Sequence, residues 1–567
     1  CQKQADNGVA GSRAFGDWTG AAQLAPGAAG LLAQGEEALL AARCQWYAPG
    51  RLFLPLLLVA LLGGLYLALQ LQWATRPPEL QEMEEAAASA DPASLAEAAQ
   101  HHVTAEVARS IGCYFATLDS IVFTMVIPDS YDIVVSLGGN AILSGAMIGA
   151  HKFGTACGAA VFYCALRMFP DIWRTGARST LLISALCNVF GTAIYAVIAA
   201  ASDNRELLAD QFLSRILLVS LFVGRITGGF GSGIRLMLVR SHIARLTPRA
   251  QRPCQQSRFL FAITLGMGLG PLLAALVKTM DVCHQGGHQR FLPTGIAGLT
   301  LSLCQIVAAW QVRPVTDAPD FLDREESGAA AMLGREEADR RRCLIFCGLA
   351  FSVLRGLCLS GVEAASAMLL EVRFGWHPFF VGLTIGLAFL TCIPWRMLFL
   401  RFRTDLPLSQ WIQLFMGMSM LGSLLLFRLP VSASKLGFSK NLERGVFAGV
   451  LLVGDGLLFP CFFLSDSLVQ GLILQYPLPA ETSLLNINGV NLMNTVLLDG
   501  FARVLGPALS RFHVSEHGQN AYAAQQMILT LAAGAIAMQG FLPKLRQLEE
   551  GRGAKAGGEG GKPGHKS

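Results

Sequence analysis

Six ionisable residues lie within long apolar stretches of this sequence, where an ionised side chain needs a specific role. They are Asp119, Arg225, Arg355, Glu363, Asp455 and Arg503. A charged side chain at the centre of a membrane helix costs at least about 2.5–3.5 kcal/mol on insertion scales, so each needs an opposite charge or a ligand. Arginine guanidinium groups can hold a small anion, and a buried carboxyl group can carry a proton. Except for Asp455, which lies in a Gly-Asp-Gly sequence, these residues form the predicted solute-binding or proton-coupling set.

Each of these residues also has a structural explanation. Arg225 could bind an anion in a cavity, or it could hold two helix ends together through a salt bridge. Glu363 follows Arg355 by eight residues, so the two can face one cavity as a proton carrier and a cation, or form a static pair. Arg503 could contact an anion, but Asp499 lies four residues earlier on the same helix face, and an ion pair between them is the favoured alternative.

The stretch GRITGGFGSGIR, residues 224–235, has enough glycine either to wrap a phosphate or to let two helices approach closely. A phosphate-binding P-loop needs a preceding strand and a final Gly-Lys-Ser/Thr, whereas here Gly233 is followed by Ile and Arg. The glycines instead recur four residues apart, as Gly224 with Gly228 and Gly229 with Gly233. This spacing predicts flat packing faces on a membrane helix, and it argues against a nucleotide-using enzyme.

The composition indicates a membrane protein. Of the 567 residues, 53% are hydrophobic and only 15% are charged, and the mean hydropathy is +0.47. Soluble domains carry about 25% charged residues. The apolar runs are continuous rather than alternating, which favours helices over a transmembrane barrel. Most cysteines fall inside these runs, where they act as small hydrophobic side chains. Cys283, His284 and His288 are interpreted as a polar loop rather than a metal site.

The apolar segments divide the chain into an all-α, polytopic arrangement of six plus six spans. The predicted spans are 111–128, 141–166, 179–201, 211–233, 257–279 and 291–311, followed by 343–368, 378–400, 411–427, 444–464, 484–508 and 521–541. The predicted regions are an arm at 1–110, a six-helix half at 111–312, a connector at 313–342, a second half at 343–541 and a disordered tail at 542–567. A further apolar run at 52–69 is either a thirteenth helix or a cleaved targeting segment.

The basic residues of the loops predict the orientation in the membrane. Arginines cluster after the second, fourth and eighth spans, whereas the loop after the first span has none, so the even-numbered loops and the connector are assigned to the cytosol. The loop at 428–444 is also basic and opposes this assignment. The arginines after the fourth span mainly set topology, and binding of anionic lipid is the alternative.

Three sets of residues form recognisable motifs: Arg225 with the glycines around it, Gly266, Gly270 and Pro271 in the fifth predicted span, and the loop residues Arg174, Gly176 and Arg178. These motifs resemble those of the major facilitator superfamily. In the loop motif the acidic residue is displaced, and Asp171 is its nearest equivalent. Taken together the motifs are closest to the branch of plant vacuolar SPX-type phosphate transporters and lysosomal major facilitator proteins, although no SPX-like segment is recognisable in residues 1–110.

The resemblance implies a secondary transporter that alternates access to a site near the bilayer midplane. The expected cargo is a small solute, with an anion such as phosphate as the leading candidate, moved together with protons. The resemblance also implies a vacuolar, lysosomal or other endomembrane location. A monomer is the default expectation for the oligomeric state. No cofactor, metal or nucleic acid is expected, and HxxxxD, GxSxG and HExxH enzyme motifs are absent from the sequence. The alternative is a membrane receptor or scaffold on the same fold that binds without transporting.

Overall fold

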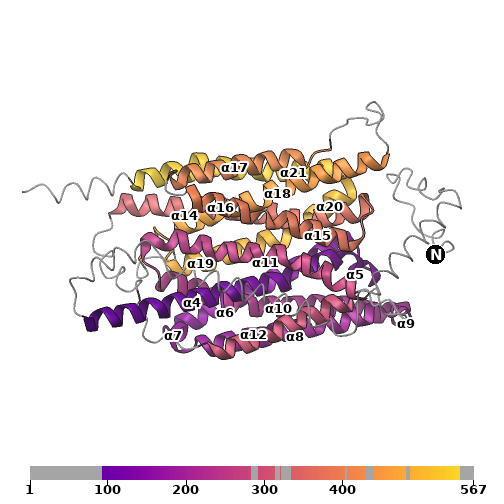
Figure 1. The fold of residues 1–567 in the computed structure, drawn as a ribbon, viewed down its shortest axis with the longest axis horizontal. Coiled ribbons are helices and arrows are strands. Elements are labelled where there is room, and N and C mark those ends of the chain that lie inside the picture. The colour runs from indigo at the N-terminus through magenta and orange to yellow at the C-terminus, as the bar shows by residue number, and fades with distance from the viewer. Residues whose placement is uncertain are drawn as a thin grey trace, which may run out of the picture.

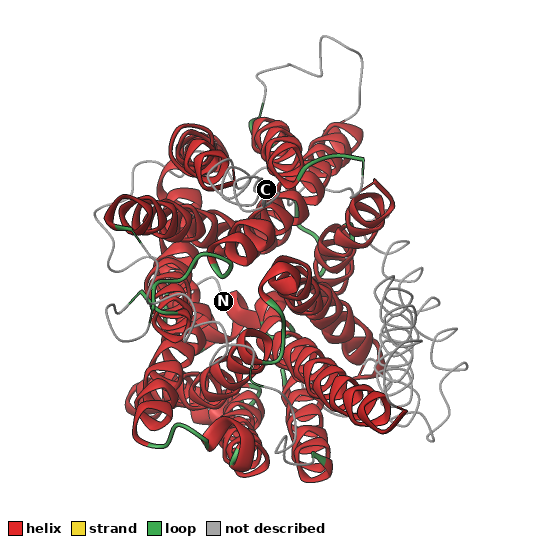
Figure 2. Ribbon diagram, turned by 90° about the vertical axis from the view of Figure 1, so that its left-hand side faces the viewer, coloured by secondary structure: helices red, strands yellow, loops and turns green. Residues whose placement is uncertain are grey.

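The computed structural model describes residues 92–281, 291–312, 320, 334–402, 405–428, 440–479 and 485–549. Within these ranges every regular element is a helix (Figures 1 and 2). The predicted apolar run at 52–69 and the predicted Cys283, His284 and His288 loop lie outside the described residues. Nine of the described helices are long and apolar enough to cross a membrane. The chain is an integral multi-pass membrane protein.

The helices form two groups along the chain. The amino-terminal group contains α4 (Pro92–Thr124), η2 (Ile127–Asp129), α5 (Ser130–Ser136), α6 (Ala141–Met168), α7 (Ile172–Thr175), α8 (Ala177–Ser202), α9 (Arg205–Ala209), α10 (Gln211–Arg245), α11 (Arg252–Asp281) and α12 (Leu292–Gln311). The carboxy-terminal group contains α14 (Arg335–Met368), η4 (Leu369–Arg373), α15 (Pro378–Leu390), α16 (Cys392–Phe402), α17 (Leu408–Leu425), α18 (Lys440–Ile473), α19 (Ile487–Thr495), η6 (Val496–Ala502), α20 (Arg503–His517), α21 (Gln519–Ala535) and η7 (Ile536–Phe541).

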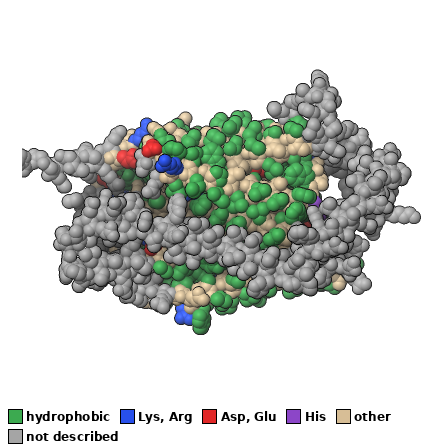
Figure 3. All heavy atoms as spheres, in the orientation of Figure 1, with side chains coloured by type: hydrophobic (Ala, Val, Ile, Leu, Met, Phe, Trp, Pro, Cys, Tyr) green, Lys and Arg blue, Asp and Glu red, His purple; other side chains and the backbone are tan. Residues whose placement is uncertain are grey.

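The two groups lie one above the other in Figure 1, with the long helices running along the long axis of the molecule. The indigo to magenta helices occupy the lower part and the orange to yellow helices the upper part. Helix α11 lies at the boundary, where it packs against α15 and α18, while α20 packs against α6. Hydrophobic side chains cover most of the visible middle of the surface, and the coloured Lys, Arg, Asp and Glu side chains lie mostly toward one end (Figure 3). This distribution suits a bilayer around the middle of the molecule.

Several helices extend beyond the predicted spans. Helix α4 begins at Pro92 rather than at 111, and α10 continues to Arg245 rather than ending at 233. The last helical stretch continues to Glu549. Each extension is rich in Ala, Leu, Met, Arg or Lys, which favour helix, so the helix continues after the apolar character of the sequence fades. Hydropathy therefore locates the spans in the sequence but not the helix ends.

The glycines of α10 allow it to pack against two neighbouring helices. A Cβ atom on Gly229 would lie 1.9 Å from the carbonyl oxygen of His151, and one on Gly233 would lie 2.0 Å from that of Thr155, both on α6. Gly224 faces α8 instead, where a Cβ would lie 2.8 Å from Cγ2 of Ile194. The two glycine pairs seen in the sequence thus lie on faces that contact different helices.

The glycines of α11 permit a similar approach to α4. A Cβ on Gly266 would lie 2.3 Å from the carbonyl oxygen of Thr117, and one on Gly270 would lie 2.1 Å from Oγ1 of Thr124. The carbonyl oxygen of Pro271 lies on the opposite side, 2.8 Å from a Cβ built on Gly382 of α15. Helix α11 therefore contacts both groups at close range.

We expect Gly233→Ala to lower the thermal unfolding midpoint of the purified protein in detergent. The added methyl group meets backbone rather than a movable side chain, so α6 and α10 must separate, at a cost of about 1–3 kcal/mol. Gly417→Ala on α17 is the matched control, because a Cβ there has no neighbouring atom within 4 Å. An equal decrease in both variants would show that α6–α10 contact is not the cause.

Candidate functional site

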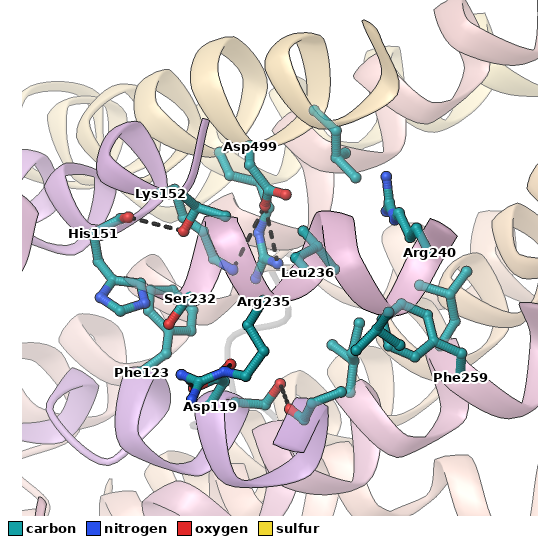
Figure 4. Close-up of a pocket in the computed structure, with 18 of the residues that line it drawn as sticks. Asp119, Phe123, His151, Lys152, Ser232, Arg235, Leu236, Arg240, Phe259 and Asp499 are labelled. Carbon is teal, nitrogen blue, oxygen red and sulfur yellow. Dashed lines mark hydrogen bonds and ion pairs between the residues drawn. The ribbon is translucent and has the colours of Figure 1, made fainter. Parts of the chain in front are cut away.

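A cavity of about 60 Å³ lies between the two helix groups. Its wall comes from α4, α6, α10 and α11 on one side and from α14, α18, η6 and α20 on the other (Figure 4). This volume accommodates roughly four water molecules or a solute with a few heavy atoms.

Five cationic side chains line this cavity. They are Lys152, Arg235, Arg240, Arg355 and Arg503. Two carboxylates, Asp119 and Asp499, also line it, and two more, Glu363 and Asp466, lie just behind the wall, where each contacts one of the arginines. Charges buried in a low-dielectric region must be neutralised, so the pairing of these nine groups decides what the cavity can bind.

Asp119 and Arg235 form a tight pair on the amino-terminal side of the cavity. Nε of Arg235 donates to Oδ2 of Asp119 at 2.8 Å, and Nη2 donates to Oδ1 at 2.5 Å. Asn188 and Gln305 also donate to Asp119 Oδ1, at 2.9 and 3.1 Å. Asp119 therefore accepts hydrogen bonds from three side chains of its own helix group, which hold the Asp119–Arg235 pair in place.

The carboxy-terminal group contains two further pairs. Nη2 of Arg503 lies 2.7 and 2.9 Å from the two carboxylate oxygens of Glu363. Nη2 of Arg355 lies 2.7 Å from Oδ2 of Asp466 on α18. Glu363 therefore contacts Arg503, and Arg355 contacts Asp466, so the static Glu363–Arg355 pair does not form. The predicted Asp499–Arg503 contact is longer, at 3.9 Å.

Arg240 differs from the other cations because its described contacts are all with neutral groups. It is 3% exposed. Its Nη1 donates to Oγ1 of Thr495 at 2.8 Å and to the carbonyl oxygen of Asn491 at 3.3 Å, and its Nε has no hydrogen-bond partner among the described residues. Five cations against four carboxylates leave one positive charge, and Arg240 is the cation without a carboxylate. The cavity can therefore accept an anion.

Comparisons with known proteins identify the fold. No protein-family model matches the sequence. The chain is 25% identical over 218 residues to an SPX domain-containing membrane protein of Arabidopsis thaliana, and this stretch covers 38% of the chain but only 27% of that protein.

Solved structures match over most of the chain. The xylose transporter of E. coli matches with a TM-score of 0.54 at 16% identity, over 78% of this chain and 98% of its own. A D-xylose–proton symporter gives 0.53 at 17% identity over the same shares. A proton:xylose symporter of the major facilitator superfamily, bound to 6-bromo-6-deoxy-D-glucose, also gives 0.53 at 15% identity, again over 78% and 98%. The chain has the major facilitator fold.

Within the major facilitator fold, Arg225 lies apart from the larger cavity. It lines a second cavity of about 20 Å³ inside the amino-terminal group, together with Tyr195. Its Nη2 donates to the carbonyl oxygen of Phe123 at 3.2 Å, and Phe123 also contacts Lys152 and Arg503 through its ring. Arg225 thus contacts both the backbone and the ring of Phe123, a residue that lines the larger cavity.

Asp455 also lies outside the larger cavity. It is 1% exposed and interacts with Ser366 of α14, and Tyr522 of α21 lies close to both residues.

Among the described residues, no group of three or more His, Cys, Asp and Glu side chains is arranged to hold a metal ion.

The loop-motif residues lie at the end of the fold that the loop charges assign to the cytosol. Arg174 of α7 lies 3.8 Å from Oδ2 of Asp320, and Arg245 of α10 lies 2.7 Å from the same atom. Arg178 stacks on the ring of Trp310, with 4.4 Å between its Cζ and the ring centroid. Gly176 separates α7 from α8. The acidic partner of this motif comes from the connector at Asp320, and Asp171 has no ion pair described with Arg174.

Sequence reasoning missed three of the five cavity cations. Lys152 follows His151 within the predicted span 141–166, and this charged residue in an apolar run was a usable signal. The predicted fourth span ends at 233, which places Arg235 and Arg240 in the following loop. Helix α10 continues through both residues and brings them to the cavity. The assignment of these two arginines to a loop is wrong.

We expect Asp119→Leu and Arg235→Leu each to destabilise the fold by about 3–5 kcal/mol, because each leaves the other charge buried and unpaired. The double variant should be more stable than the sum of the two effects predicts, since it removes both charges together. Thermal unfolding of the purified proteins measures the three midpoints. Additive effects would mean that the pair is not energetically coupled.

Proposed function

We propose that this protein is a secondary active transporter that moves a small anion across a membrane by alternating access. The observation that carries the proposal is the excess positive charge at a cavity lined by both helix groups. Inorganic phosphate is the first candidate, because it is small enough for the cavity and because the Arabidopsis relative contains an SPX domain. An endomembrane such as the vacuolar or lysosomal membrane is part of the proposal, by analogy alone.

Contacts on either side of the cavity support alternating access. Toward one end, Arg511 of α20 donates from Nη2 to the Ser130 hydroxyl at 2.7 Å and from Nη1 to the Ser144 hydroxyl. Toward the other end, Arg252 donates to the carbonyl oxygen of Leu474 at 3.3 Å, and Gln256 donates to Gln470 at 3.2 Å. Both sets join the two helix groups. Breaking one set while keeping the other would open the cavity to one side of the membrane at a time.

The Glu363–Arg503 pair supports coupling to protons. The carboxylate of Glu363 pairs with the guanidinium group of Arg503, which would otherwise be available to bind an anion. A proton on Glu363 would weaken this pair and leave Arg503 to contact the anion. Anion and proton would then bind together, as in a symporter. One of the structural neighbours is named as a D-xylose–proton symporter.

Counterflow in proteoliposomes tests transport directly. Vesicles loaded with unlabelled phosphate should take up labelled phosphate, and Arg240→Ala should reduce the uptake roughly 10- to 100-fold, the size expected for loss of a charge-assisted hydrogen bond. Arg215→Ala, at an exposed position on the same helix, is the matched control. Arg225→Ala should weaken uptake less than Arg240→Ala, because Arg225 lies outside the larger cavity.

Absence of uptake by the wild-type protein would exclude phosphate as the substrate. Sulfate, organic acids, sugars and organic cations would then be tested as substrates. Binding of a solute without any flux would instead favour a receptor or scaffold on the same fold.

Substitution of Glu363 tests the proton role. With a pH gradient across the vesicle membrane, the wild-type protein should accumulate phosphate against its gradient, and Glu363→Gln should not, because an amide cannot take up and release a proton. Exchange of labelled for unlabelled phosphate needs no net proton movement and should continue in this variant. Accumulation that survives the substitution would assign proton coupling to another residue.

A further inference from the structure

Lys152 and Asp499 form an ion pair that joins the two helix groups across the cavity. Nζ of Lys152 on α6 lies 3.5 Å from Oδ1 of Asp499 on η6 (Figure 4). Both side chains are largely buried, with exposed fractions of 14% and 6%. The Asp119–Arg235, Glu363–Arg503 and Arg355–Asp466 pairs each lie within one group. Movement of the groups relative to each other would therefore change the Lys152–Asp499 distance while leaving the other three pairs intact.

Asp499 is also less firmly held than the other cavity carboxylates. Its contacts with Lys152 and Arg503 measure 3.5 and 3.9 Å, longer than a charge-assisted hydrogen bond of about 2.7–2.9 Å. It interacts electrostatically with Lys152, Arg503, Arg240 and Arg355. Asp499 thus lies among four cations without a short bond to any of them. A bound anion in the same position would be stabilised most by the electrostatic attraction of these cations.

The backbone around Asp499 supports a position that can change. Asp499 lies in η6, a π-helical segment between α19 and α20. Such wide turns interrupt the regular hydrogen bonding of an α-helix and occur frequently at functional sites. The neighbouring Gly500 allows the segment to approach α6, because a Cβ there would lie 2.7 Å from Cβ of Ala156. The contact between η6 and α6 thus depends on an irregular turn with a small residue.

We propose that the Asp499 carboxylate takes the place of the transported anion when the cavity is empty. Without substrate its carboxylate neutralises Lys152, so the empty cavity can close and return across the membrane. When a small oxyanion enters, its oxygens replace the carboxylate on Lys152 and complete the neutralisation of Arg240. This inference rests on the proposed anion transport, and it identifies the substrate class as oxyanions that resemble a carboxylate in charge and size, such as phosphate.

The charge of Asp499 matters most for the transporter without a bound anion. With Asp499 the empty cavity carries one excess positive charge, and without it five cations would face three carboxylates. Closing an empty cavity that contains two unneutralised cations is costly. When an anion is bound, its charge compensates these cations, so the loss of Asp499 changes the cost of closure much less. Removal of the charge at 499 should therefore turn a protein capable of net transport into one that favours exchange.

Two assays on the full-length protein in proteoliposomes test this inference. Labelled phosphate inside the vesicles leaves either into phosphate-free buffer, which requires return of the empty protein, or into buffer with unlabelled phosphate, which does not. The ratio of the first rate to the second should fall about tenfold or more in Asp499→Asn. A tenfold fall corresponds to an increase of only about 1.4 kcal/mol in the free-energy barrier for return of the empty protein. Asp499→Glu should keep a ratio near the wild-type value.

Glu516→Gln is the matched control, because it makes the same carboxylate-to-amide change at an exposed position of α20, and its ratio should equal that of the wild type. A wild-type ratio in Asp499→Asn, or an equal fall of both rates, would overturn the inference while leaving anion transport standing. A wild-type protein that moves neither phosphate nor another oxyanion would overturn both. The thermal midpoint of each variant separates loss of folding from loss of return.

Discussion

The cost of burying charge between membrane helices is the constraint on which this structure depends. Five cationic side chains meet at one cavity, and an ammonium or guanidinium group away from water is stable only beside compensating charges or hydrogen-bond acceptors. Four carboxylates supply most of that compensation, three of them through contacts shorter than 3 Å within one helix group. Three of the five cations are thereby paired within their own group, whereas Lys152 pairs across the groups with Asp499 and Arg240 contacts neutral groups. The groups can then move as rigid bodies without separating the pairs that lie within one group.

Close helix packing places these charges. Lys152 projects from α6, and Arg235 and Arg240 project from α10, so the distance between these helices determines how close the cations lie to one another. That distance is set by backbone contact at Gly229 and Gly233, where even a methyl group would not fit. The glycines thus serve helix packing, and this packing determines where Arg235, at the end of the stretch 224–235, meets the cavity.

The sequence was sufficient to predict the helices but not the pairing of charges. Apolar runs separated by polar loops predict membrane-spanning helices, because crossing a bilayer demands a length and a composition visible in the sequence. The described residues contain nine helices that are long and apolar enough to do so. Helix ends were harder, since residues such as those after 233 favour helix without being apolar, and Arg235 and Arg240 were therefore missed. The partner of Glu363 could not be predicted, because sequence spacing relates Glu363 only to residues on its own helix, such as Arg355. Arg503 lies 140 residues away, and the packing of α14 against α20 brings it to Glu363. The acidic partner of Arg174 was equally hidden, since Asp320 is distant in sequence.

The ion pairs of the cavity differ in a way that fits movement around a bound anion. The pairs within a group are short and often supported by other donors, as Asp119 is by Asn188 and Gln305. The pair between groups, Lys152 with Asp499, is longer and shared with Arg503. A short, desolvated pair across the cavity would fix the two groups together, and no charge at all would leave Lys152 unneutralised in the closed state. An intermediate strength satisfies both requirements of the proposed transport cycle, because the carboxylate neutralises Lys152 when the cavity is empty and can leave Lys152 when another anion arrives.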